Sequence, residues 1–219
     1  VLINSYTMIR IEKLGFSYGQ VPVLKNITMN LEPGKIYGLL GENGVGKTTL
    51  LTLLAGLKKP LQGNIDIDGS APYSRTPQVL ENQFYLADEM LSVPMKAAEY
   101  ARITGEFWPN YKQDTFEEIM ELFENTSDKK MNEMSTGQLK KTYISLALAL
   151  GCKYLFLDEP TNGLDIPSKA QFRSALMKYT GEDSTIVIST HQVRDLENII
   201  DPIIILDRQD VLLLSLIHI

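Results

Sequence analysis

The segment GENGVGKTT (41–49) constrains the fold of this 219-residue chain more than any other. The preceding residues KIYGLLG have the apolar run of a buried strand, and the following KTTLLTLLAGL (47–57) predict a helix. A G-x-x-x-x-G-K-[ST] pattern between a strand and a helix is a phosphate-binding loop. The chain is therefore expected to fold around a sheet whose strands alternate with helices.

The residues of this loop have separate roles in binding phosphate. Gly41, Gly44 and Gly46 let the backbone curl so that its N–H groups point at phosphate oxygens. Lys47 supplies a positive charge to the β- and γ-phosphates, and Thr48 offers a hydroxyl to Mg²⁺. The predicted nucleotide-binding residues of the loop are Gly41, Glu42, Asn43, Gly44, Val45, Gly46, Lys47, Thr48 and Thr49.

The remaining pattern predicts one α/β domain over residues 1–219, with a mainly parallel sheet flanked by helices and an N-terminal antiparallel part. Amphipathic helices over 95–108 and 111–125, split by Trp108-Pro109-Asn110, predict a small helical subdomain over 91–149. The nucleotide-binding core is assigned to 8–90 and 150–212. Further helices are expected over 136–150, 168–180 and 193–199, and strands over 153–160, 184–190 and within 202–214.

The segment YLFLDEP (154–160) places two acids at the end of an apolar strand. Asp158 is positioned to hold Mg²⁺, directly or through water, beside the phosphate loop. Glu159 is positioned to orient or deprotonate an attacking water. The alternative is that both acids merely end a strand in solvent, and the complete phosphate loop argues against it.

Composition narrows the function further. The net charge is −6, from 27 acidic and 21 basic residues, which argues against nucleic acid as the main ligand. The pair Lys140-Lys141 is expected to lie on a solvated helix face. The single cysteine, Cys152, cannot form an internal disulfide, is expected to be a small core residue, and favours a cytosolic setting.

The two ends of the sequence are unusual for a folded domain. VLINSYT precedes Met8, where an alternating strand begins, and the chain ends VLLLSLIHI. We expect Met8 to be the natural start and both ends to carry cloning or truncation effects. No apolar run approaches the roughly 20 residues needed to cross a bilayer.

A second helix start suited to anions occurs at MSTGQ (134–138). Together, GENGVGKTT, MSTGQ and YLFLDEPTNGLD resemble the nucleotide-binding domain of ATP-binding cassette (ABC) proteins over about residues 8–210. In that family, the motif matching MSTGQ reaches across a head-to-tail dimer and caps the γ-phosphate held by the partner. The resemblance thus implies that Ser135, Gly137 and Gln138 contact the nucleotide of a second ATPase subunit. Thr136 replaces a glycine of the usual Leu-Ser-Gly-Gly-Gln, a change expected to be tolerated.

The same resemblance assigns four more positions. Tyr18 matches the aromatic residue that stacks on adenine, and His191 matches a histidine that contacts the γ-phosphate. Asp165 matches the loop that connects the two composite sites. Asp88 stands, with Glu89, where the family has a glutamine that touches Mg²⁺ or water, so it is carried over as a metal ligand, and its effect on coupling to transport is left open.

The resemblance implies an ATP-hydrolysing subunit that binds ATP and Mg²⁺ and powers separate transmembrane permease subunits. Glu159, His191 and Lys47 are the expected catalytic residues. The helical insertion looks similar to bacterial export-type cassettes of the drug and bacteriocin self-protection kind, which favours export over import. The expected location is cytoplasmic, peripheral at the inner face of the cell membrane. The alternative is a regulatory or non-transport soluble ABC ATPase that binds ATP as a scaffold.

Overall fold

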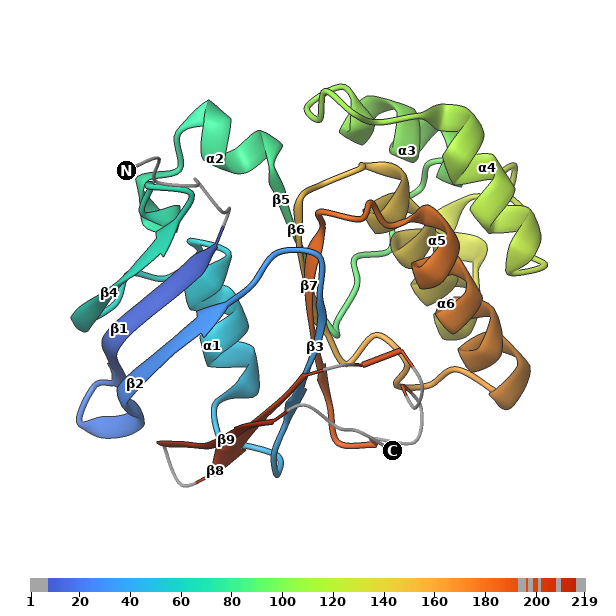
Figure 1. The fold of residues 1–219 in the computed structure, drawn as a ribbon. Helices are drawn as coiled ribbons and strands as arrows, with labels where there is room; N and C mark the ends of the chain where they lie inside the picture. Colours follow the sequence, from blue (N-terminus) through green and yellow to red (C-terminus); the bar gives the residue numbers. More distant parts are fainter. Residues whose placement is uncertain (1–7, 193–195, 197–198, 201, 208–209, 216–219) are drawn as a thin grey trace.

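The computed structural model describes residues 8–192, 196, 199–200, 202–207 and 210–215. In this part of the chain the strands form two sheets, one of six strands and one of three (Figure 1). Neighbouring strands from β5 to β8 are parallel, and β9 is antiparallel to β8. The order of the larger sheet is β5 (Gln83–Leu86), β6 (Tyr154–Asp158), β7 (Thr185–Thr190), β3 (Ile36–Leu40), β8 (Ile203–Asp207) and β9 (Asp210–Ser215).

The smaller sheet is antiparallel, with β1 (Ile9–Tyr18) between β2 (Val21–Leu31) and β4 (Gln62–Ile67). Ile9 lies opposite both Leu31 and Ile67, so apolar side chains of the three strands share one face. The alternating residue Arg10 is exposed, as expected for a sheet with one face on the core. The predicted fold class, with its antiparallel N-terminal part, is confirmed.

The described helices cover the larger sheet on both sides (Figure 1). They are α1 (Lys47–Leu54), α2 (Pro77–Glu81), α3 (Ala97–Gly105), α4 (Gln113–Leu122), α5 (Thr136–Ala149) and α6 (Ile166–Tyr179), with 3₁₀ turns at Pro72–Ser74 and Met131–Glu133. The break between α3 and α4 falls around Trp108-Pro109-Asn110, as predicted. The short α2 was not predicted, and most of the helix expected over 193–199 lies outside the described residues.

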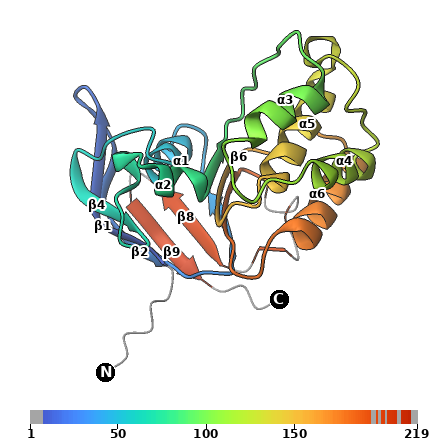
Figure 2. The same cartoon turned by 90° about the horizontal axis from the view of Figure 1, so that it is seen from above.

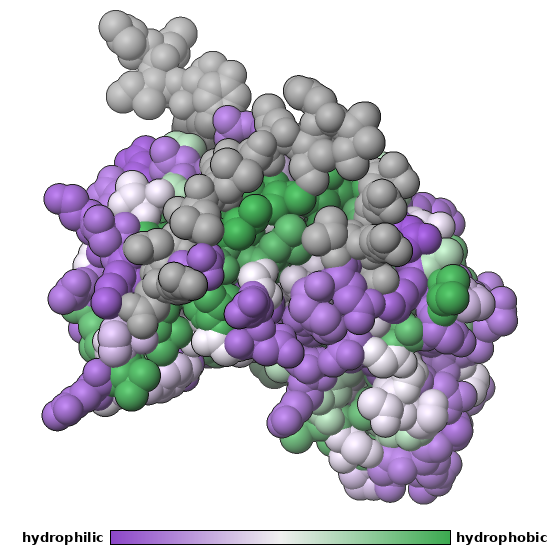
Figure 3. Space-filling model, turned by 90° about the horizontal axis from the view of Figure 1, so that it is seen from below, coloured by the Kyte–Doolittle hydropathy of each residue, from purple (hydrophilic) through white to green (hydrophobic). Residues whose placement is uncertain are grey.

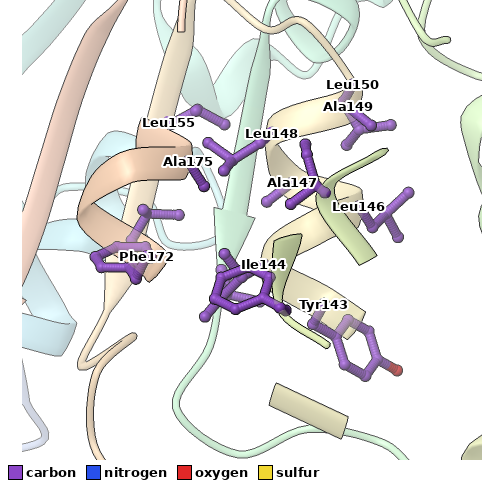
Figure 4. Close-up of a cluster of buried hydrophobic side chains, with 14 of the residues drawn as sticks. Tyr143, Ile144, Leu146, Ala147, Leu148, Ala149, Leu150, Leu155, Phe172 and Ala175 are labelled. Carbon is purple, nitrogen blue, oxygen red and sulfur yellow. The ribbon is translucent and has the colours of Figure 1, made fainter. Parts of the chain in front are cut away.

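Strand β6 is buried on both faces, and its side chains belong to two core clusters. Figure 2 shows α1 on one side of β6 and α5 and α6 on the other. Leu155 and Leu157 pack with α5 and α6, whereas Phe156 packs with α1 and the antiparallel sheet. In the first cluster, Leu148 of α5 and Ala175 of α6 lie close to Leu155 (Figure 4). The period-2 alternation of a strand explains why consecutive residues of β6 contribute to opposite clusters.

The register of the parallel strands decides where the functional segments meet. Leu40 at the end of β3 lies opposite Thr190 of β7, and Asp158 at the end of β6 lies opposite Ser189. The phosphate loop, the two acids and His191 therefore emerge from one edge of the sheet. Ligands of open α/β sheets bind outside these carboxyl ends.

The surface has a mixed character. Seen from below, hydrophilic residues cover most of the periphery, and hydrophobic residues gather toward the centre (Figure 3). Among the described residues, no helix is both long and apolar enough to cross a bilayer.

Candidate nucleotide-binding site

The phosphate loop has the backbone conformations that the sequence predicted. Gly41 and Gly46 have φ angles of 155° and 111°, in a region that favours glycine. A Cβ on Gly41 would lie 2.4 Å from the carbonyl oxygen of Leu206, so the loop has no room for a side chain there. Helix α1 begins at Lys47, immediately after the loop, so the positive end of its dipole and its first N–H groups face the loop.

The Lys47 side chain is held inside the loop and is only 6% exposed. Its Nζ donates to the carbonyl oxygens of Gly41 at 2.8 Å and Glu42 at 3.2 Å. It also lies 3.8 Å from Oε1 of Glu159. The ammonium group is thus fixed between the phosphate loop and the acid that follows β6.

Asp158, only 3% exposed, accepts hydrogen bonds from three hydroxyl groups. Thr48 Oγ1 donates to Oδ2 at 2.7 Å, Ser189 Oγ donates to Oδ1 at 2.5 Å, and Tyr85 Oη donates to Oδ2 at 3.3 Å. Burial, and secondarily the Asp158 carboxylate, raises the pKa of Tyr85, so its hydroxyl keeps its proton and remains a donor.

The donors at this point suit Mg²⁺, which prefers oxygen ligands and retains several waters. Thr48 and Asp158 would hold the ion on the protein side, because their oxygens already lie 2.7 Å apart. No group of three or more acidic, histidine or cysteine side chains in the described ranges could hold a metal by itself. The ion would therefore depend on phosphate oxygens and water for its remaining ligands.

Glu159 adopts a left-handed backbone conformation with φ of 45°, which costs a non-glycine residue about 1–3 kcal/mol. Its N–H donates to Ser189 Oγ at 2.9 Å. Its Oε2 lies 3.0 Å from Nδ1 of His191. The carboxylate therefore lies between His191 and Lys47, at the mouth of the site.

A cavity of about 540 Å³ brings most of the predicted residues together. Tyr18 lies at its rim, half exposed, with its hydroxyl 3.4 Å from Oγ1 of Thr49. Gly41, Glu42 and Val45 belong to the loop but do not line the cavity. The lining residues are Tyr18, Val23, Asn43, Gly44, Gly46, Lys47, Thr48, Thr49, Asp88, Asp158, Glu159, Asn162 and His191.

Asp88 lines the same cavity, but its closest contact is with a lysine. Oδ1 lies 2.8 Å from Nζ of Lys140, and Oδ2 lies 3.5 Å from Nδ2 of Asn162. The prediction that Lys140 lies on a solvated helix face is wrong, because Lys140 is only 4% exposed. Its side of α5 packs against the loop after β6, where Nζ donates to the carbonyl oxygens of Glu159 and Asn162. Lys141, its neighbour, is partly buried and donates to the carbonyl of Phe123 at 3.1 Å. The metal-binding role of Asp88 stays a prediction.

The MSTGQ segment forms the start of α5 and is absent from the residues that line the described cavity. Ser135 is the N-cap: its Oγ accepts from the N–H of Gln138 at 3.2 Å, and Gln138 Oε1 accepts from the N–H of Ser135 at 3.1 Å. Ser135 is exposed, and a Cβ on Gly137 would meet only the carbonyl oxygen of Gly163, 4.0 Å away. This helix start faces outward from its own chain's site.

Asp165 caps the next helix. Its Oδ1 accepts from the N–H of Ser168 at 2.9 Å. Hydrogen bonds from Ser168 also hold the pKa of the Asp165 carboxyl below its usual range. The side chain is therefore an ionised cap, exposed at the start of α6.

The sequence did not predict the two residues that bind Asp158 from neighbouring strands, Ser189 and Tyr85, or the cavity-lining residues Val23 and Asn162. Ser189 and Tyr85 lie in apolar strand segments, STIVIST and NQFYLAD, where a hydroxyl reads as an ordinary strand residue. Their position in the strands is the signal that could have found Ser189 and Tyr85. Each is the next-to-last residue of a strand that pairs with β6, close to the carboxyl end where Asp158 lies.

Solved structures share this architecture. One described as the ATP-binding subunit of an ABC transporter superposes with a TM-score of 0.85, covering 96% of this chain and 90% of that one at 22% identity. A putative ABC transporter ATP-binding protein from Pyrococcus furiosus gives a TM-score of 0.75, with 85% and 92% covered at 25% identity.

Curated relatives point the same way. The chain is 31% identical over 218 residues to an uncharacterized ABC transporter ATP-binding protein, YdbJ, of Bacillus subtilis, covering 93% of this chain and 68% of the relative. It is 30% identical to the bacitracin transport ATP-binding protein BcrA of Bacillus licheniformis, covering 89% and 65%. It is 28% identical to the lantibiotic transport ATP-binding protein SrtF of Streptococcus pyogenes, covering 89% and 84%. The family model described as "ABC transporter" matches residues 24–162. The resemblance stated from the motifs is thereby confirmed, and this chain belongs to the ABC transporter family.

Proposed function

We propose that this chain binds ATP with Mg²⁺ in the 540 Å³ cavity and hydrolyses it to ADP and phosphate. The observation that carries the proposal is the position of Glu159, directly after β6, with its carboxylate 3.0 Å from His191 and 3.8 Å from Lys47 at the end of the phosphate loop. A nucleophile-activating acid, a cation and an imidazole thus converge where the phosphate groups would lie.

Each residue has a distinct task in the proposed reaction. The N–H groups of the loop and the Lys47 ammonium bind phosphate oxygens and stabilise negative charge that develops on the transferred group. Thr48 and Asp158 would hold Mg²⁺, which would supply positive charge to offset the negative charge of the phosphate groups. Glu159 accepts a proton from the attacking water or orients it, and His191 holds the carboxylate through its Nδ1 contact of 3.0 Å.

The proposed active form is a head-to-tail dimer. Ser135, Gly137 and Gln138 lie outside their own chain's cavity, and Ser135 is exposed at the start of α5. The positive end of that helix dipole and its N–H groups suit the γ-phosphate of a nucleotide held by a second chain. Two such chains, identical or not, would form two composite sites.

We further propose that the chain is the ATPase subunit of a membrane transporter, of the export type, at the cytoplasmic face of the membrane. The relatives named for bacitracin transport and lantibiotic transport support the transporter role. A mainly apolar groove of about 630 Å³ between the core and the helical part offers a docking surface for a permease subunit. Phe107 at its edge is 73% exposed, and Leu57 is 49% exposed.

The test is light scattering coupled to size-exclusion chromatography on Glu159→Gln, with and without Mg-ATP. The substitution removes the group that activates water, so ATP-bound dimers should accumulate. The matched control is Lys47→Ala with Glu159→Gln, which should stay monomeric because phosphate binding is lost. A dimer that forms only with ATP supports the proposal.

Two results would contradict it. Glu159→Gln that binds ATP yet stays monomeric at tens of micromolar protein argues against the composite site between two copies of this chain. Failure of the unmodified protein to bind ATP in calorimetry argues against the site itself.

A further inference from the structure

We propose that Lys140 is a positioning residue for hydrolysis: its ammonium group holds the main chain of Glu159 in place, with Asp88 as the counter-charge. The inference rests on the proposed function, because it concerns the residue that activates water. Lys140 acts through Glu159 and does not itself reach the nucleotide, since it is 4% exposed and does not line the cavity.

Three oxygen atoms from two separate loops surround the Lys140 ammonium group. Nζ lies 2.8 Å from Oδ1 of Asp88, in the segment after β5. It donates to the carbonyl oxygen of Glu159 at 3.2 Å and to that of Asn162 at 3.0 Å, both in the loop after β6. An ammonium group has three N–H donors, so each donor of Lys140 has one of these oxygen atoms as its acceptor.

The contact with Glu159 matters because of that residue's backbone. A φ of 45° is unfavourable for a glutamate, and the surrounding structure must compensate for it. The N–H of Glu159 is held by Ser189 Oγ at 2.9 Å, and its carbonyl oxygen by Lys140 at 3.2 Å and by the N–H of Asn162 at 3.1 Å. Of these three donors, only Lys140 is a charged group. It is also the only one that belongs to α5, the helix that begins in the MSTGQ segment.

Asp88 is what allows a lysine to be buried here. A buried ammonium group without a counter-charge would be strongly unfavourable, and Asp88 supplies the carboxylate at 2.8 Å. The Asp88 side chain is itself 41% exposed, so the free-energy cost of desolvating its carboxylate is small. The acid at this position is thereby accounted for as the partner of Lys140, without direct metal binding.

The first experiment compares Lys140→Met with Lys141→Met, the adjacent lysine of α5, whose Nζ donates to the Phe123 carbonyl and makes no hydrogen bond to Glu159 or Asn162 among the described residues. Lys140→Met should lower kcat by about 10²-fold with KM for ATP changed less than about 3-fold, because the phosphate loop is untouched and a misplacement of about 1 Å has that cost. Lys141→Met should keep kcat within about 3-fold. Equal kcat values for the two variants would overturn the proposal.

A second comparison separates positioning from general destabilisation. In the Glu159→Gln background, measured by single turnover, Lys140→Met should lower the residual rate by less than about 3-fold, since the residue it positions is already disabled. A further 10²-fold loss in that background would show that Lys140 acts elsewhere, and would contradict the proposal.

Asp88→Asn tests the counter-charge. The Mg²⁺ concentration that gives half the maximal rate should stay within about 2-fold, and the double variant with Lys140→Met should be no slower than Lys140→Met alone. A rise of 10-fold or more in that Mg²⁺ concentration would make Asp88 a metal ligand and would refute its assignment here.

Hydrogen exchange on the nucleotide-free protein distinguishes failure of this inference from failure of the proposed function. Lys140→Met should raise amide exchange in peptides that contain residues 159–162, and leave α1 unchanged. If the protein proves not to hydrolyse ATP, this exchange still shows whether Lys140 holds the loop, and unchanged exchange would overturn the inference independently.

Discussion

Ser189→Ala is the substitution whose consequence follows most directly from the geometry. The Ser189 side chain is 0% exposed, donates to Asp158 Oδ1 at 2.5 Å, and accepts from the N–H of Glu159 at 2.9 Å. Alanine removes a hydrogen bond to a charged group, worth about 1.5–3 kcal/mol, and leaves a partly buried N–H without that acceptor, at about 1–3 kcal/mol. Thr48 and Tyr85 still bind the carboxylate, so we expect a loss near the lower end of the sum, about 3 kcal/mol.

The matched control is Ser145→Ala. Ser145 is also 0% exposed, but its Oγ donates to the carbonyl oxygen of Lys141, one turn earlier in the same helix, at 2.8 Å. That carbonyl lies within α5 and keeps its place in the helical hydrogen-bond ladder, and alanine favours a helix by about 0.5 kcal/mol, so the change should stay within about 1 kcal/mol.

The assay is thermal and urea unfolding of both variants without nucleotide. At about 2–4 °C per kcal/mol for a chain of this size, Ser189→Ala should lower Tm by roughly 6–12 °C. It should also lower kcat, because Asp158 and Glu159 lose a shared anchor. If Ser189→Ala and Ser145→Ala have the same Tm, the reasoning about a charge-assisted anchor between the two acids is refuted.

Three further predictions use separate parts of the structure. Tyr18→Ala should weaken ATP binding about 5- to 100-fold in titration calorimetry, while Tyr18→Phe stays within about 3-fold, because stacking on a base contributes about 1–3 kcal/mol; equal affinities would exclude adenine stacking. Burial raises the pKa of the Cys152 thiol to about 12 from 9.0, so a disulfide reagent at pH 8 should react with it about 10³-fold more slowly in folded than in unfolded protein. Because the unfolded thiol ionises first, the stability that Cys152 contributes should fall as pH rises from about 9 toward 12, so the difference in unfolding free energy between the protein and Cys152→Ala should change over that range. Gly105→Ala would place a Cβ 2.2 Å from the ring of Tyr111, and should cost about 1–3 kcal/mol in urea unfolding; an unchanged midpoint would mean that the ring moves freely.

The sequence located the site residues whose ionisable side chains end a strand, or follow one directly or through the phosphate loop. Lys47, Asp158 and His191 come together because parallel strands deliver their carboxyl ends to one edge, and the apolar runs before them identify those strands. The fold class followed from the same alternation of strands and helices.

The sequence did not predict contacts that depend on how a side chain is oriented in the folded chain. Helix α5 buries polar as well as apolar residues, so its sequence pattern does not say which way Lys140 points. The contact of Lys140 with Asp88 depends on how α5 packs against the rest of the fold. Ser189 and Tyr85 are ordinary strand residues until the register places them beside Asp158. The five residues of α2 are too few for a helical period to be visible.

The reciprocal hydrogen bonds at the start of α5 have a consequence for association. Ser135 Oγ and Gln138 Oε1 accept from each other's main-chain N–H groups within one subunit, and Lys129 Nζ adds a contact of 3.2 Å to Gln138. Because the Ser135 oxygen is used as an acceptor, its own O–H remains a donor that can point outward to an anion. A second molecule that brings a phosphate group to this surface would meet a helix end that is already rigid. Little conformational entropy would then be lost at this end of α5 when two subunits join, and the free energy of ATP binding would remain available to close the interface.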